Sequence, residues 1–202
     1  MRSPLLAALL TATALSAACT STPGAQQDPA TSSPPATTSS PTTSTPSSTS
    51  TDPARSARGL VVKKVGERAM IGNDESDMRA SFTLDAIEVD PPCAEGGAPE
   101  HGHFIAVAFT VRTTALLDTS RHWFISPQEF QVVGPDGVTE SDVSTTAGFG
   151  CLPNSEYLPK IPYTPGSTYT GKVVLDSRNP SGVITYRPYF VTPGWEWVFP
   201  TT

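Results

Sequence analysis

The motifs of several common enzyme classes are missing from this 202-residue sequence. It has only three cysteines and no C-x-x-C pair, which argues against thiol–disulfide exchange chemistry. It has no Gly-x-Ser-x-Gly elbow and no His-Glu-x-x-His pair, the signatures of serine hydrolases and zinc peptidases. We therefore expect a protein that is not an enzyme and that needs no cofactor.

Positive charge is scarce as well. The chain carries 13 Lys and Arg against 19 Asp and Glu, and its longest basic run is Lys63-Lys64. Proteins that bind nucleic acids usually have a basic patch, because phosphate neutralisation dominates their affinity. An acidic surface also disfavours adsorption to anionic lipid headgroups. We expect no nucleic-acid partner, and any membrane attachment must come from a dedicated anchor.

Charges and aromatic side chains are nearly absent from the first 58 residues, which contain five charged residues and no aromatic one. All three histidines and every aromatic side chain lie in residues 59–202. Only this second part can build a hydrophobic core, and a segment of its length is typical of one domain.

The N-terminus has the pattern of a secretory signal peptide. Arg2 supplies a positive charge, residues 5–15 form an apolar run, and residues 16–18 are small, as at a cleavage site. The apolar stretch is shorter than the roughly 20 residues that span a bilayer as a helix. The sequence therefore predicts export and not a retained membrane helix.

The segment Leu15-Ser16-Ala17-Ala18-Cys19 resembles the lipobox of bacterial lipoproteins. Its two alanines match that motif, whereas Ser16 stands where the family usually has leucine. The resemblance implies a lipoprotein signal peptide over residues 1–18 and a diacylglyceryl group on Cys19, with the protein on the outer face of the cell membrane. The alternative is an ordinary signal peptide that ends near a cysteine.

Residues 19–58 are expected to form a disordered tether behind the lipidated cysteine. Of the 34 residues from 20 to 53, 26 are Ser, Thr or Pro. Such a segment has too little apolar surface to offset the entropy of ordering. Its threonines permit O-glycosylation.

If Cys19 is lipidated, Cys93 and Cys151 remain as an even pair in an exported domain. A structural disulfide is then the usual outcome. A catalytic thiol would leave its partner unexplained.

Residues 59–202 have the pattern of an all-β domain. Residues 78–89 alternate between apolar and polar, with a slip near 86–87 that predicts a β-bulge. Residues 104–111 are nearly all apolar, which is typical of a strand buried on both faces. Further strands are predicted at 130–133, 169–175, 183–191 and 195–199, with a turn at 134–137 and one short helical turn within 115–124. Short, regularly spaced strands favour a β-sandwich.

Four segments together carry a resemblance to a known family: residues 64–67, 103–111, 126–137 and 165–176. Their pattern resembles the immunoglobulin-like domain of a large group of Gram-positive lipoproteins, and it is similar to that of a secreted mycobacterial immunoprotective antigen. The resemblance covers residues 59–199. It implies an immunoglobulin-like β-sandwich of about seven to nine strands, carried on a tether, without enzymatic residues.

His101 and His103 are the best candidates for metal ligands, with Glu95 and Glu100 nearby. Residues two apart in an extended chain share a face, so both imidazoles could reach one ion. A third ligand is not evident, and solvated loop histidines are the alternative.

Three other patterns resemble parts of known binding sites. Residues 166–173 stop one residue short of a phosphate-binding loop, because Val173 follows the lysine where Ser or Thr is needed. Residues 73–77 are acidic but lack the spacing of a calcium loop, which favours an exposed hairpin connection. Trp195 and Trp197 could form an exposed aromatic platform with the nearby Tyr186, Tyr189 and Phe190, or contribute to the core.

We expect a non-enzymatic, lipid-anchored, extracytoplasmic module that binds a protein or cell-wall partner through a sandwich face or its loops. The alternative is a small-molecule or metal-binding lipoprotein with a pocket near His101 and His103. A flat apolar face would favour the first function, and a deep cavity the second.

Overall fold

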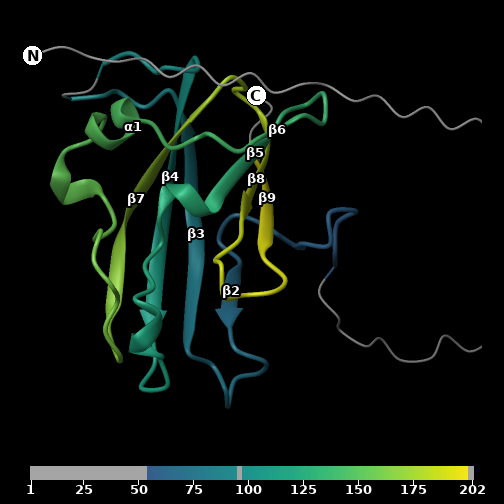
Figure 1. The fold of residues 1–202 in the computed structure, drawn as a ribbon, viewed down its shortest axis with the longest axis vertical. Helices are drawn as coiled ribbons and strands as arrows, with labels where there is room; N and C mark the ends of the chain where they lie inside the picture. Colours follow the sequence, from purple (N-terminus) through teal and green to yellow (C-terminus); the bar gives the residue numbers. More distant parts are fainter. Residues whose placement is uncertain (1–53, 95–96, 200–202) are drawn as a thin grey trace, which may run out of the picture. The chain divides into compact units, whose positions relative to one another are not determined.

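The computed structural model describes residues 54–94 and 97–199, which form a sandwich of two β-sheets (Figure 1). The predicted all-β sandwich is confirmed. The predicted signal peptide, the lipidation site Cys19 and the tether as far as residue 53 lie outside the described residues.

One sheet has four antiparallel strands in the order β2-β3-β4-β7. Its three long strands run side by side in Figure 1. The pairing of β3 with β4 shifts register between Leu84 and Ala86, so the predicted bulge is confirmed. The strands are β2 (Arg68–Ile71), β3 (Ala80–Val89), β4 (His103–Thr113) and β7 (Thr168–Ser177).

The other sheet has five strands in the order β1-β9-β8-β5-β6. Strand β1 runs parallel to β9, and the remaining pairs are antiparallel. The Gly137 amide donates to the Gly134 carbonyl and closes the predicted turn between β5 and β6. The strands are β1 (Val61–Lys63), β5 (Phe130–Val133), β6 (Thr139–Glu140), β8 (Gly182–Tyr186) and β9 (Trp195–Phe199).

Over residues 54–94 and 97–199, helical structure consists of short turns between strands. The turn expected within residues 115–124 is the 3₁₀ helix η1 (Thr119–Arg121). The strand predicted at 183–191 ends at Tyr186, because Pro188 has no amide to donate to a sheet and the chain turns there instead. The others are η2 (Pro127–Glu129), α1 (Thr146–Gly150) and η3 (Asn154–Glu156).

The main core lies between the two sheets and is rich in aromatic rings. Phe82 lies near its centre, with its ring centroid 4.8 Å from that of Trp195 in an edge-to-face arrangement. Trp195, Trp197 and Phe199 all point inward from β9 and are buried. They therefore belong to the core and do not form the exposed aromatic platform that the sequence also allowed.

A second, smaller apolar cluster covers part of the outer face of the four-stranded sheet. Phe104 and Ala106 of β4 and Val174 of β7 are buried there beneath Leu152 and Tyr157. Because Ile105 and Val107 point into the main core, this end of β4 is buried on both faces, as the sequence predicts.

The predicted disulfide is present and belongs to this second cluster. Cys93 is bonded to Cys151, with their Cα atoms 4.4 Å apart. The Ala94 amide donates to the Cys151 carbonyl at 2.8 Å. The bridge therefore joins the β3–β4 loop to the segment that follows α1.

The folded domain begins earlier than the predicted boundary at Gly59. The buried carboxylate of Glu196 accepts hydrogen bonds from Ser56 Oγ and Arg58 Nε, both at 2.9 Å. Arg55 forms a β-bridge with Val61. Residues 55–58, which the sequence places in the tether, are thus bound to the domain, because Ser56 and Arg58 supply hydrogen-bond donors that the buried Glu196 carboxylate needs.

Replacing Cys93 and Cys151 together by serine is expected to lower the free energy of unfolding by about 2–4 kcal/mol, since the bridge closes a long loop in the unfolded chain. Urea denaturation of the variant and of wild type, each with and without reductant, measures the change. Reductant should destabilise wild type and leave the variant unaffected. Equal stability of the two proteins without reductant would contradict the prediction.

Candidate functional site

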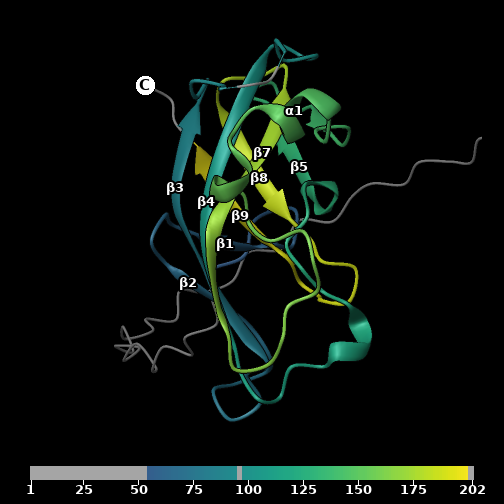
Figure 2. The ribbon, with the colours of Figure 1, turned by 90° about the vertical axis from the view of Figure 1, so that its left-hand side faces the viewer.

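An apolar pocket of about 150 Å³ lies at the β7 edge of the sandwich. Three segments of the chain meet there: the chain leading into η2, the stretch from α1 to Lys160, and β7. Figure 2 shows α1 and the coil after it beside β7. The lining residues are Phe124, Ile125, Ser126, Pro127, Gln128, Gly148, Phe149, Tyr157, Leu158, Lys160, Lys172, Val173 and Val174.

Backbone contacts fix the wall that α1 and the following coil provide. The Leu158 amide donates to the Lys172 carbonyl at 3.0 Å, and Tyr157 forms a parallel bridge with Lys172. The buried Tyr157 hydroxyl donates to the Gly148 carbonyl at 2.7 Å and accepts from the Leu152 amide at 3.0 Å. The segment from the end of α1 to Lys160, called the covering segment below, is therefore bound both to β7 and to α1.

Gly171 explains why this segment can approach β7 so closely. A Cβ at this position would lie 2.5 Å from the Leu158 nitrogen and 2.6 Å from the Tyr157 carbonyl carbon. Any other residue would push the segment away from the strand. The glycine and lysine that resemble a phosphate-binding loop are thus strand residues of β7, and Gly171 serves close packing.

The mouth of the pocket is positively charged. The Lys160 ammonium lies 4.3 Å from the Tyr157 ring centroid and 4.7 Å from that of Phe149, a cation–π arrangement on two rings. Within the described part of the chain Lys160 takes part in no ion pair. Lys172, by contrast, pairs with Glu156 at 3.0 Å. The pocket therefore has one positive charge that no carboxylate of the described residues neutralises.

A fully buried carboxylate organises the end of the domain that carries α1. Asp176, at the end of β7, accepts hydrogen bonds from the amides of Glu100 and His101 at 2.7 and 3.0 Å. It also accepts from Thr145 Oγ1 at 2.8 Å. Thr145 in turn caps α1, because its hydroxyl accepts from the Gly148 amide. One side chain thus fixes both the loop before β4 and the start of the pocket wall.

The two candidate metal ligands contact different groups. His101 Nδ1 lies 3.3 Å from the Asp176 carbonyl oxygen, whereas His103 Nδ1 lies 2.9 Å from Asp90 Oδ2. Over residues 54–94 and 97–199, no three His, Cys, Asp or Glu side chains come together as a metal site would require. The neighbouring Glu95 lies outside the described residues. The structure therefore gives no support to a metal site at His101 and His103.

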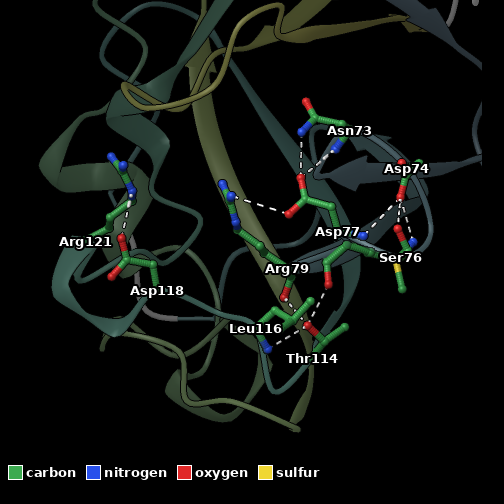
Figure 3. Close-up of polar contacts among 10 residues, drawn as sticks. Asn73, Asp74, Ser76, Asp77, Arg79, Thr114, Leu116, Asp118 and Arg121 are labelled. Carbon is green, nitrogen blue, oxygen red and sulfur yellow. Dashed lines mark hydrogen bonds and ion pairs between the residues drawn. The ribbon is translucent and has the colours of Figure 1, made fainter.

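The acidic segment at residues 73–77 is the connection between β2 and β3, as predicted (Figure 3). Asp74 Oδ1 accepts from the amide of Ser76 at 2.8 Å and from its hydroxyl at 2.6 Å, and these hydrogen bonds lower the Asp74 pKa. Asp77 Oδ2 accepts from Asn73 Nδ2 at 2.7 Å. These carboxylate oxygens therefore stabilise the turn through hydrogen bonds within it.

Glu129, the last residue of η2, has a partly buried carboxyl group. Its Oε2 atom is enclosed and has no hydrogen-bond partner among the described residues. Burial raises the pKa of Glu129 to about 7, against the opposing effect of the Tyr186 hydroxyl. That hydroxyl accepts a hydrogen bond from Trp123 Nε1 at 3.1 Å. This residue was not identified from the sequence, because a lone Glu before a strand is common.

The raised pKa of Glu129 predicts a pH dependence of stability. Between about pH 4.5 and 7 the folded protein keeps a proton that the unfolded chain has lost, so stability falls as pH rises through this window. The fall should be roughly 2–3 kcal/mol, and Glu129→Gln should remove most of it. Urea denaturation at a series of pH values checks this, with the exposed Glu88→Gln as control. Parallel stability curves for wild type and Glu129→Gln would contradict it.

The residues of the pocket were not identified from the sequence. Phe149, Tyr157 and Lys160 have no motif spacing, and their only local signal is a stretch rich in proline and aromatic residues. They become neighbours only when the covering segment folds back on β7.

Comparison with known proteins adds a distant structural likeness. No family model matches the chain, and no curated protein matches it. Among solved structures, the chain is similar to MPT63, a secreted protein from Mycobacterium tuberculosis, at 14% sequence identity and with a TM-score of 0.49. The match covers 69% of this chain and 98% of that one. A likeness at this level carries no statement about what this chain binds.

Proposed function

We propose that the protein is a non-enzymatic, extracytoplasmic binding module, held at the outer face of the cell membrane by a lipid on Cys19, that takes a small ligand into the β7 pocket. The observation that carries the proposal is the apolar pocket with an unneutralised lysine at its mouth. Binding sites for small molecules are typically concave, mostly apolar and fitted with a few polar groups.

The lining of the pocket supports binding over catalysis. The described residues that form it include no histidine, aspartate, glutamate or cysteine, the groups that most often act as general acids, bases or nucleophiles. Ser126, the one hydroxyl amino acid besides Tyr157, hydrogen-bonds to the neighbouring Gln128 side chain. The Tyr157 hydroxyl already donates a hydrogen bond to the Gly148 carbonyl and accepts one from the Leu152 amide.

The disulfide supports the compartment. Bonds of this kind persist outside the reducing cytoplasm, and Cys93–Cys151 fastens the same segment that walls the pocket. Together with the signal-peptide pattern and the cysteine that follows it, the disulfide supports the extracytoplasmic location that we propose.

The pocket is tested with small ring compounds, for example toluene, p-cresol and benzoate, by ligand-observed NMR on the full-length protein. At least one should bind saturably, because an apolar cavity of this volume accepts a single ring. Ser126→Phe, which fills the pocket from its rim, should reduce binding at least tenfold. The exposed Ser141→Phe is the matched control and should bind like wild type. Absence of binding to wild type, or equal binding to Ser126→Phe, would refute the proposed site.

The anchor is tested separately. Cys19→Ala should move the protein from the membrane fraction to the medium or leave the signal peptide uncut, since lipidation of the thiol precedes cleavage in the lipoproteins that the motif resembles. Cell fractionation and gel migration measure both outcomes. A variant that fractionates and migrates like wild type would show that Cys19 is not lipidated.

A further inference from the structure

We infer that the ligand of the β7 pocket is a small monocarboxylic acid whose body is a single ring or a short aliphatic chain. The inference rests on the proposed function and adds the chemical class of the ligand. It follows from the volume of the pocket, from the apolar side chains inside it and from the charge at its mouth.

The volume limits the size of the apolar part. A pocket of about 150 Å³ matches the size of an engineered apolar cavity that takes up benzene. Leu158, Val173 and Val174 are buried aliphatic residues of its lining, and Phe149 adds an aromatic surface. A ring or a short chain fits this space, whereas a long acyl chain does not.

The charge at the mouth selects an anion. Lys160, Lys172 and Glu156 together carry one net positive charge, because Glu156 already pairs with Lys172. The chain as a whole is acidic, with 13 Lys and Arg against 19 Asp and Glu, so this site has the opposite sign to the net charge of the chain. One uncompensated ammonium complements a monoanion, and Glu156 disfavours a second negative charge beside it.

The aromatic rings hold the ammonium where an anion can reach it. The Lys160 ammonium rests against the rings of Phe149 and Tyr157, and both residues line the pocket. Lys160 is itself exposed, so a carboxylate can approach it from solvent while the apolar body enters the pocket. The same rings are thus available both to the cation and to the apolar body of the ligand.

Paired compounds that differ only in charge test the inference. Benzoate and hexanoate are compared with benzamide and hexanamide, using the full-length protein and isothermal titration or ligand-observed NMR. Wild type should bind each acid at least fivefold more tightly than its amide, and added salt should reduce that preference. Lys160→Gln should bring the preference close to one, Lys160→Arg should keep it, and the exposed Lys64→Gln should leave it unchanged.

The outcomes separate the two proposals. Equal binding of acids and amides by wild type, lost in Ser126→Phe, would overturn the carboxylate inference and leave the binding function standing. An acid preference that survives Lys160→Gln would also overturn the inference. Failure of every compound to bind wild type would refute both.

Discussion

The buried carboxylate of Asp176 is the constraint on which this end of the fold depends. A carboxylate with no solvent exposure is costly unless hydrogen-bond donors surround it. The donors come from the amides of Glu100 and His101 and from the Thr145 hydroxyl, and so from two connections that are far apart in sequence. Satisfying one side chain of β7 therefore orders the loop before β4 and positions the helix that walls the pocket. Glu196, on β9 of the other sheet, is also a buried carboxylate, and its hydrogen bonds fix residues 56–58 against the domain.

The disulfide and the second apolar cluster act on the same segment. Cys151 follows α1 directly and is bonded to the β3–β4 loop, while Leu152 and Tyr157 cover the outer face of β4 and β7. Gly171 allows the covering chain to lie against the strand. The pocket wall is therefore held by a covalent bond, by a buried carboxylate and by backbone hydrogen bonds. For the ligand that we propose, a wall held in this way lowers the free-energy cost of ordering on binding.

Most of the charged side chains discussed above have hydrogen-bond or ion-pair partners within the fold, and Lys160 has none among the described residues. The carboxylates of Asp74, Asp77 and Asp176 are occupied by hydrogen bonds within the fold. His103 likewise contacts Asp90. Lys160 differs, because its ammonium is supported by aromatic rings and not by a carboxylate of the described residues. In the function that we propose, this ammonium at the mouth of the apolar pocket recognises the ligand, in place of the histidines that the sequence suggested.

The sequence by itself determined the sandwich and the bulge near Ala86, because the alternation of apolar residues and the insertion of one residue are local signals. It predicted the pairing of Cys93 with Cys151 only once Cys19, the third cysteine, was set aside as the lipidation site. It also determined that Trp195 and Trp197 share a face, although not that this face is the core. Only the tertiary structure decided where the pocket lies and where the domain begins. Phe149, Tyr157 and Lys160 come to β7 through a fold-back that no spacing records, and Arg58 joins the domain by pairing with Glu196, a residue near the other end of the chain. Contacts between distant segments depend on which buried groups need partners, and that need arises only when the sheets have packed.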